Sequence, residues 1–297
     1  MPLPWSFGHP PLIVAAATPL TDGGTTLDEG AIGPMVAFLE GHGADGVFCC
    51  GTTGEGMLLS VDERRQAAVA FRAVVRGKLL VHAGAQTTAD TTSLASHAAE
   101  TGADGVAVIP PPYFPLDPEA LTEHLVAAAA ACAPLPFFIY VFTRRSGYPV
   151  PAEVIRRVGG RAGNLVGLKV SESPFAQVAP YLELGLPVLV GSEPLIVQAL
   201  AAGAVGTVSG LAAAFPDVVR SVLDAPSPFG SSRLDALRGA MEAQPYIASV
   251  KHVLARRGTP VRPDMRAPLQ PLTDEQTGRL DKALAAMALL EPSAATA

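Results

Sequence analysis

The sequence predicts an α/β protein, a (β/α)₈ TIM barrel followed by extra C-terminal helices. Eight short apolar runs alternate with amphipathic helical patterns, which is the order of elements that parallel β–α units need. The chain of 297 residues fits one such barrel, since these domains commonly run to about 250 residues or more. No Gly-x-Gly-x-x-Gly follows the first apolar run, which disfavours the competing doubly wound sheet.

The expected strands are short, apolar and separated by helices. They are Leu12–Ala17, Gly46–Cys50, Leu79–Gly84, Gly105–Ile109, Phe137–Val141, Leu165–Val170, Pro187–Gly191 and Gly206–Ser209. Helical patterns cover residues 28–42, 61–76, 88–101, 118–133, 151–161, 174–185 and 194–202, and another follows Phe215. Several begin with capping signals, such as Asp28, Ser60 with Glu63 three residues later, and Asp117 before Pro118.

The chain divides into a barrel and a helical extension. Similar helix-to-strand turns at Gly41–Gly46 and Thr101–Gly105 support a repeated plan. The chain after the eighth strand is rich in Ala, Leu and Arg and reads as helical. We therefore expect a catalytic barrel over residues 1–225 and a C-terminal helical extension over 226–297, packed on the barrel. The tail Pro292–Ala297 is expected to fray.

Composition excludes several classes of protein. Apolar residues make up 49% of the chain and charged residues 16%, as in a well-buried globular protein. The net charge of −6 and the lack of any Lys/Arg run give no reason to expect a nucleic acid partner. A small anionic substrate would therefore need local positive charge inside its site.

The cysteines and the N-terminus indicate a cytoplasmic protein. The three cysteines show no CxxC or Cys/His ligand spacing, so we expect core thiols in a reducing compartment. Met1–Trp5 lacks a basic start and a long apolar run, so no signal peptide is visible. Gly, Pro or charge interrupts the apolar stretches well short of a membrane span, so no membrane partner is expected.

Lys169 is the most informative residue. It is one of four lysines, and the pattern places the other three, Lys78, Lys251 and Lys282, where an ammonium can reach water. Lys169 lies inside the buried strand Leu165–Val170, where desolvation should lower the pKa of its amine and make it a usable nucleophile. Such a lysine can form a Schiff base with a ketone. The alternative is a lysine at a strand end that reaches solvent or pairs with a carboxylate.

Other candidate groups follow the ends of neighbouring strands, which share one face of a barrel. The second strand ends in Gly51–Glu55, whose hydroxyls and amides could hold a carboxylate. Tyr140 lies near the end of the fifth strand and Arg144-Arg145 follow it. An amine, a phenol, an anion-holding turn and a guanidinium together form a plausible keto-acid site.

Each of these groups also has a structural interpretation. Gly51–Glu55 could be a plain strand-to-helix turn, and Tyr140 could be a core aromatic with its hydroxyl satisfied. Arg144 and Arg145 could be a solvated pair in a loop. Tyr113 could pack the proline-dense loop that holds it. Their convergence at one barrel face favours the functional interpretation.

Several motifs follow one another along the chain: Gly51-Thr52-Thr53-Gly54-Glu55, Tyr140, Arg145-Ser146-Gly147 and Gly167-Leu168-Lys169. In this order they resemble the dihydrodipicolinate synthase/N-acetylneuraminate lyase family. This resemblance implies class I aldolases or related lyases on a (β/α)₈ barrel, usually tetramers built from tight dimers. It extends from about Val14-Ala15-Ala16-Ala17-Thr18-Pro19 through Gly206-Thr207-Val208-Ser209.

The resemblance assigns catalytic roles to four residues. Lys169 matches the lysine that forms the Schiff base with pyruvate, and Tyr140 matches the tyrosine that moves protons there. Thr52 links Tyr140 to a second tyrosine, matched by Tyr113, which in the family reaches across the dimer interface into the neighbour's site.

It also implies residues that bind substrate. Thr53 lies with Thr52 near the pyruvate carboxylate, and Arg145 matches the arginine that grips the carboxylate of the aldehyde. We also expect Gly51 and Val208 among the residues that bind substrate. No metal or organic cofactor is required, and the sequence offers no obvious metal site.

Departures from the family pattern concern the second substrate. The fifth strand ends in Tyr140-Val141-Phe142-Thr143 in place of Tyr-Asn-x-Pro, and Ala212–Pro216 replaces Ala-Asn-x-x-Pro. The best single prediction is a 4-hydroxy-tetrahydrodipicolinate synthase (dihydrodipicolinate synthase)-like lyase that uses pyruvate and a small aldehyde. The alternatives are another aldolase of the family, of the 2-keto-3-deoxy sugar acid, hydroxy-oxoglutarate or N-acetylneuraminate lyase type, or a catalytically silent barrel that binds a keto acid.

Overall fold

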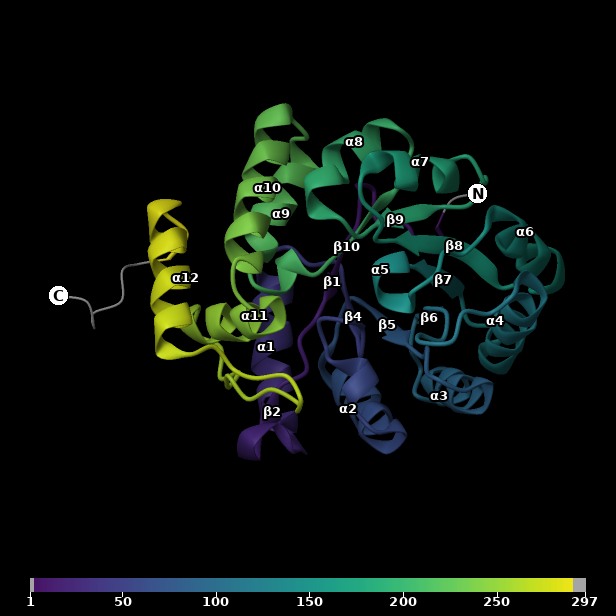
Figure 1. Ribbon diagram of the computed structural model, residues 1–297, viewed down its shortest axis with the longest axis horizontal. Coiled ribbons are helices and arrows are strands. Elements are labelled where there is room, and N and C mark those ends of the chain that lie inside the picture. The colour runs from purple at the N-terminus through teal and green to yellow at the C-terminus, as the bar shows by residue number, and fades with distance from the viewer. Residues whose placement is uncertain (1–2, 291–297) are drawn as a thin grey trace.

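A computed structural model describes residues 3–290 and shows a closed parallel barrel (Figure 1). Its strands close in the order β1-β10-β9-β8-β7-β6-β5-β4, and each expected strand is present. The predicted TIM barrel is therefore confirmed. The bounds are β1 Leu12–Ala15, β4 Gly46–Cys49, β5 Lys78–His82, β6 Gly105–Val108, β7 Phe137–Val141, β8 Leu165–Val170, β9 Val188–Val190 and β10 Gly206–Ser209.

Helices surround the barrel. The outer helices are α1 Glu29–Gly41, α2 Val61–Val74, α3 Thr88–Glu100, α4 Pro118–Cys132, α6 Ala152–Arg161, α7 Phe175–Leu182, α8 Ile196–Ala201 and α9 Pro216–Asp224. The predicted caps act as expected: the hydroxyl of Ser60 accepts from the amide of Glu63, and the carboxylate of Asp117 accepts from the amide of Ala120.

Several short elements were not predicted, among them a strand pair and a one-turn helix. The antiparallel pair β2 (Leu20–Thr21) and β3 (Thr26–Leu27) follows the first strand, and the one-turn helix α5 (Thr143–Ser146) follows β7. Both are too short to show a hydrophobic period, so the sequence pattern gives no signal for them.

The strands direct alternate side chains into the barrel and toward the helices. The inner cluster includes Phe48, Phe138 and Tyr140, and the side chain of Trp5 stacks on Phe138 with ring centroids 5.5 Å apart. On β8, Leu168 and Val170 belong to the outer cluster. Lys169 lies between them and therefore faces the inside of the barrel.

Three further helices follow the barrel and lie together on one side of it, with α12 outermost (Figure 1). They are α10 Pro228–Glu242, α11 Tyr246–Arg256 and α12 Asp274–Ala286. The division at residue 225 stays a prediction, and the tail that we expected to fray lies outside the described residues.

The prediction that Lys251 reaches water is wrong. Its side chain on α11 is fully buried, and its ammonium lies 2.6 Å from the carboxylate of Glu55. It also donates a hydrogen bond of 2.6 Å to the carbonyl of Asp264. The helical pattern of α11 shows which residues share a face, but not that this face meets a loop some 200 residues away in sequence.

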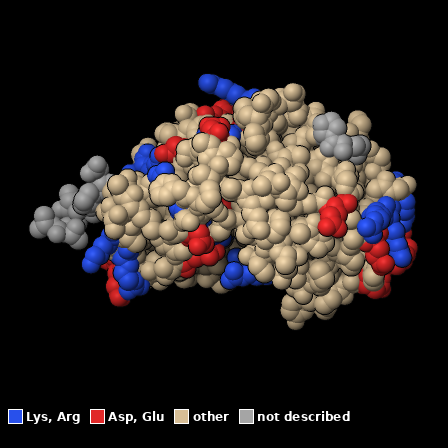
Figure 2. Space-filling view, turned by 90° about the horizontal axis from the view of Figure 1, so that it is seen from above, with Lys and Arg blue, Asp and Glu red and all other residues tan. Residues whose placement is uncertain are grey.

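The burial of the cysteines and the distribution of surface charge agree with the expectations from composition. Cys49, Cys50 and Cys132 are buried free thiols, as predicted. On the face that Figure 2 shows, Lys and Arg are interspersed with Asp and Glu and form no continuous basic stripe. Among residues 3–290, no helix is both long and apolar enough to cross a bilayer.

Candidate active site

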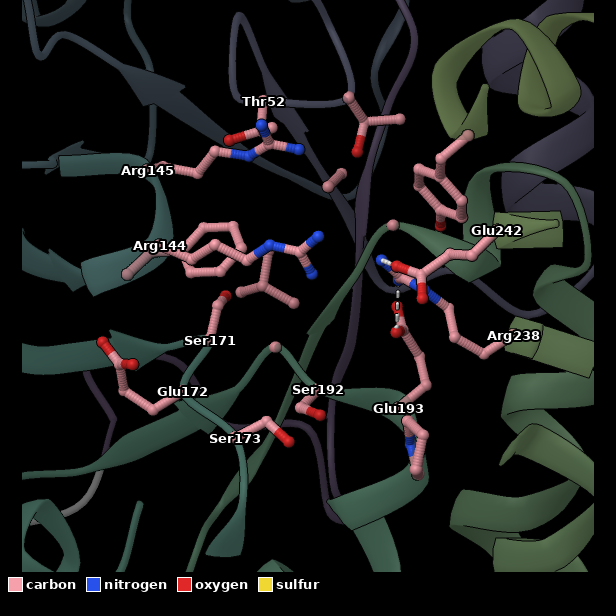
Figure 3. Close-up of a pocket in the computed structure, with 18 of the residues that line it drawn as sticks. Thr52, Arg144, Arg145, Ser171, Glu172, Ser173, Ser192, Glu193, Arg238 and Glu242 are labelled. Carbon is pink, nitrogen blue, oxygen red and sulfur yellow. Dashed lines mark hydrogen bonds and ion pairs between the residues drawn. The ribbon is translucent and has the colours of Figure 1, made fainter. Parts of the chain in front are cut away.

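A cavity of about 950 Å³ opens at the carboxyl ends of the strands (Figure 3). Its wall is formed by the ends of β7, β8, β9 and β10, by the turn after β4, by α5, and by α10 and α11. Of the residues predicted to form the site, Thr52, Thr53, Tyr140, Arg145, Lys169 and Val208 all line it. The carboxyl ends of barrel strands are where catalytic groups of this fold lie.

Lys169 lies at the bottom of this cavity in apolar surroundings. Its side chain is 5% exposed, and its nitrogen lies 3.7 Å from the ring centroid of Tyr140 and 4.2 Å from that of Phe48. Burial lowers the pKa of Lys169 to about 7, against the opposing effect of the negative charge of Glu193. A large fraction of the amine is therefore neutral near neutral pH, and the alternative in which this lysine extends to solvent does not hold.

Tyr140 is held beside Lys169 by strand register, because the two residues are partners in the β7–β8 ladder. Its hydroxyl lies 3.3 Å from the hydroxyl of Thr52, and burial raises the pKa of the phenol. The phenol thus stays protonated at neutral pH and can exchange a proton with Thr52 or with a bound substrate.

The turn that carries Thr52 and Thr53 is rigidly anchored. The hydroxyl of Thr18 donates to the carbonyl of Gly54 at 2.6 Å. Glu55 has a φ of 55°, and its carboxylate accepts from the amide of Arg266 at 2.7 Å as well as pairing with Lys251. These contacts tie the turn to the C-terminal extension, so both threonines keep fixed positions on the cavity wall.

Glycines in the same turn serve packing. A Cβ on Gly56 would lie 1.7 Å from the carbonyl oxygen of Cys50, so only glycine fits there. A Cβ on Gly51 would lie 2.6 Å from the ring of Phe48. Gly51 does not line the cavity, and its predicted contact with substrate stays a prediction.

Helix α5 carries Arg144 and Arg145 on one wall of the cavity (Figure 3). The carboxylate of Glu172 accepts a hydrogen bond from the amide of Thr143 at 2.7 Å, and Gly147, which ends the helix with a φ of 88°, donates its amide to the carbonyl of Thr143 at 2.8 Å. Both contacts fix the turn that displays the two guanidinium groups. The guanidinium of Arg145 lies 5.9 Å from the ring centroid of Phe142.

Tyr113 is not in the cavity of its own chain. Its side chain is 80% exposed, its φ is 82°, and its ring meets that of Phe114 edge-on at 4.8 Å. This exposure does not fit the interpretation that Tyr113 merely packs its loop.

Sequence reasoning missed a buried group opposite α5. Glu193, in the loop after β9, accepts from the hydroxyl of Ser209 at 2.8 Å, the amide of Leu211 at 2.9 Å and the guanidinium of Arg238 at 2.8 Å. Glu193 lies three residues beyond the end of a barrel strand, so its position could have revealed it. Arg238 lies in α10 and carries no such signal.

Tyr246 completes this side of the cavity. Its ring centroid lies 4.0 Å from the guanidinium carbon of Arg238. Its hydroxyl is buried, has no hydrogen-bond partner among the described residues, and lies 3.1 Å from where a Cβ on Gly210 would be. The hydroxyl of Thr53 lies 3.0 Å from that same point. A side chain at residue 210 would thus crowd both hydroxyls, and Thr53, Gly210 and Tyr246 all line the cavity.

The described residues offer no evident metal site. Within residues 3–290, no group of three or more His, Cys, Asp or Glu side chains is placed to hold a metal ion.

Comparison with known proteins identifies the family. The profile of the Dihydrodipicolinate synthetase family matches residues 10–287. The chain belongs to this family. Its members include lyases and aldolases, and the resemblance seen in the motifs is confirmed.

Relatives and solved structures agree with this assignment. An uncharacterized DapA-like lyase of Halobacterium salinarum is 33% identical over 95% of this chain and 93% of its own length. The 4-hydroxy-tetrahydrodipicolinate synthase of Chlorobium phaeovibrioides is 30% identical over 93% and 97%. The structure of the N-acetylneuraminate lyase of Proteus mirabilis superposes with a TM-score of 0.85 at 26% identity, over 95% of this chain and 99% of that one.

Proposed function

We propose that the protein is a class I aldolase or lyase that forms a Schiff base between Lys169 and pyruvate. The observation that supports this most is the burial of Lys169, which lowers the pKa of its amine to about 7 inside a substrate-sized cavity. A neutral amine is the nucleophile that imine formation needs.

The neighbouring hydroxyls supply the remaining steps. The amine of Lys169 attacks the ketone of pyruvate, and the adduct loses water to give a protonated imine. Loss of a methyl proton gives an enamine, whose carbon adds to the aldehyde while the aldehyde oxygen takes up a proton. Tyr140, with Thr52 3.3 Å from its hydroxyl, moves these protons. Thr52 and Thr53 hold the pyruvate carboxylate, and hydrolysis of the imine releases product.

Arg145 selects the second substrate in this proposal. Its exposed guanidinium lines the cavity and can grip the carboxylate of an aldehyde in a bidentate manner. We infer a 4-hydroxy-tetrahydrodipicolinate synthase-like activity, as the name of the Chlorobium relative states for that protein. Another keto-acid lyase of the same family is the alternative, since Phe142, which lines the cavity, belongs to the stretch after β7 that departs from the family's Tyr-Asn-x-Pro.

The enzyme is proposed to act as a cytoplasmic homo-oligomer, a dimer of dimers. Tyr113 and Phe114 are 80% and 71% exposed, and Met57 and Leu58 are exposed as well. Pro112, next to Tyr113, lines a second, more apolar cavity of about 590 Å³ together with Met57 and Leu58. Apolar side chains gathered at a surface favour association with another chain. Tyr113 would then reach the partner's site.

The C-terminal extension is part of the same catalytic unit. Arg238 and Tyr246 lie beyond residue 225 and line the cavity, while Lys251 anchors the threonine turn. Residues 1–225 and 226–297 are therefore proposed to form one functional body, in which the barrel supplies the reacting amine and the extension closes the wall.

A panel of aldehydes tests the activity directly. Consumption of pyruvate is measured with aldehydes that carry no charge, one carboxylate or several hydroxyls. The proposal predicts turnover that depends on Lys169 and prefers a carboxylate-bearing aldehyde. Pyruvate that is never consumed with any aldehyde and never forms a reducible adduct would show a silent barrel.

A further inference from the structure

The two walls of the active-site cavity differ in how their charges are balanced. On the wall opposite α5, Arg238 pairs with Glu193 at 2.8 Å and with Glu242 at 2.7 Å. Glu172 is buried and caps α5 through the amide of Thr143. Three of the four carboxylates that line the cavity are thus already engaged, and the fourth, Asp235, is exposed on α10.

The wall formed by α5 carries two guanidinium groups without such partners. Within the described part of the chain, neither Arg144 nor Arg145 makes an ion pair or hydrogen bond with a carboxylate. Figure 3 shows both side chains directed from α5 across the cavity, toward the wall that holds Glu193 and Glu242. In a protein with net charge −6, this is a local concentration of positive charge beside the proposed reacting centre.

Solvated arginines on a mobile loop would be the simpler explanation. Here, however, the turn is fixed at both ends by Glu172 and by the left-handed Gly147. The cavity volume of about 950 Å³ also lies near the upper end of the roughly 300–1,000 Å³ range of small-molecule pockets, so the cavity exceeds what pyruvate and a small aldehyde need.

We propose that the second substrate carries two acidic groups, one bound by Arg145 and the other by Arg144. This inference rests on the proposed function. The aldehyde carbon bonds to the methyl carbon of the Lys169-bound pyruvate, which gives up a proton, and the aldehyde oxygen gains one. Arg144 acts in this as a specificity-determining residue at the far end of the acceptor.

Binding to the trapped enzyme provides the test. The full-length protein is first incubated with pyruvate and borohydride, and formation of the adduct is verified by mass. Methylsuccinate, with two carboxylates, and butyrate, with one, are then titrated into the trapped enzyme by calorimetry. We expect methylsuccinate to bind at least about tenfold more tightly, because hydrogen bonds to charged groups contribute enough for such a factor.

Variants distinguish the contribution of Arg144 to binding from the effect of overall positive charge. Arg144→Gln should remove the preference for methylsuccinate and leave butyrate binding within about twofold, while Arg144→Lys should keep part of it. Arg156→Gln is the matched control, since Arg156 is an exposed arginine outside the cavity. The preference should weaken in 0.5 M salt for the wild type and for Arg156→Gln, because exposed charges are screened at about that ionic strength.

A second arm identifies the acidic groups during turnover. Pyruvate consumption is compared for succinic semialdehyde and 2-(2-oxoethyl)butanedioate, and for glyceraldehyde and its 3-phosphate. Faster consumption with 2-(2-oxoethyl)butanedioate than with succinic semialdehyde supports a substrate with two carboxylates. Faster consumption with glyceraldehyde 3-phosphate than with glyceraldehyde supports a phosphorylated aldehyde.

The outcomes are distinct. No adduct with pyruvate overturns the proposed function itself. An adduct that binds both probes equally, or a preference that survives Arg144→Gln, overturns the assignment of Arg144 while leaving the Schiff-base chemistry intact.

Discussion

Two lysines are buried in this protein, and they differ in what faces them. Lys251 lies against the carboxylate of Glu55 at 2.6 Å and the carbonyl of Asp264 at 2.6 Å. Lys169 faces the rings of Tyr140 and Phe48. Burial lowers the pKa of both amines, but at Lys251 the adjacent carboxylate opposes this effect directly. Lys251 therefore has a structural role, whereas Lys169 is a candidate nucleophile.

The contrast shows how partners decide the role of a buried amine. A charged pair with good geometry holds distant segments together, here α11 and the threonine turn. An amine without a carboxylate in contact loses its proton more readily and becomes reactive. The scaffold lysine also serves the reactive one, because the turn that it anchors carries Thr52 and Thr53.

The largest expected effect is on activity. Lys169→Met should reduce turnover to the background rate, because no other buried amine faces the cavity. Its stability at pH 8 should equal or exceed that of the wild type, since the unfolded chain carries a protonated lysine that must lose its proton on folding. Pyruvate consumption and urea unfolding measure the two effects. Lys78→Met is the control on β5, and persistent turnover in Lys169→Met would refute the proposed role.

Removal of the phenol should have the next largest effect. Tyr140→Phe should lower kcat by about 10²–10⁴-fold, the usual contribution of a positioned proton-transfer group. The fold should be unaffected, since the ring contacts with Phe48 and His82 remain. Steady-state kinetics check this, and a rate within a few-fold of the wild type would remove Tyr140 from the mechanism.

Breaking the ion pair between Lys251 and Glu55 should lower the stability of the fold. Lys251→Met should lower the free energy of unfolding by about 3–5 kcal/mol, because the buried carboxylate of Glu55 is left without its partner. The double variant with Glu55→Gln should recover much of that loss. Urea titrations of both variants measure it, and a single variant as stable as the wild type would contradict the scaffold role.

The pH dependence of imine trapping in the wild type should report the lowered pKa of Lys169. The amine of Lys169 is neutral above its pKa of about 7, so imine trapping at saturating pyruvate should be fast above pH 7 and slow below it. Well below pH 7 the rate should fall about tenfold per pH unit, as the neutral fraction does. An apparent pKa near 10 would instead indicate an amine in contact with water.

The smallest effect is expected at Tyr246. Its buried hydroxyl has no partner within the described residues, so Tyr246→Phe should raise the free energy of unfolding by about 1 kcal/mol. If this hydroxyl binds a substrate oxygen, KM should rise in the same variant. Unfolding and kinetic measurements on one preparation decide it, and unchanged values for both would leave Tyr246 as a packing residue.

The sequence predicted what depends on local pattern. The apolar run around Lys169 predicts a buried strand that carries its amine, and the capping box at Ser60 and Glu63 is readable within four residues. Parallel strands bring their carboxyl ends to one face, so the sequence alone predicts that the threonine turn, Tyr140 and Lys169 lie together.

Contacts between distant segments could not be predicted in this way. The pair of Lys251 with Glu55 and the pair of Arg238 with Glu193 join the C-terminal helices to loops of the barrel. Their formation depends on how α10 and α11 pack against the barrel, which no local period records. For the same reason, the sequence could not show that part of the cavity wall comes from the extension.

The most direct test of the central claim is to trap the imine and locate it. The wild type and Lys251→Met are treated with pyruvate and borohydride, digested and analysed by mass spectrometry. The account predicts one reduced pyruvate adduct in each protein, on the peptide that contains Lys169. An adduct on Lys251 or on an exposed lysine, or no adduct at all, would contradict it.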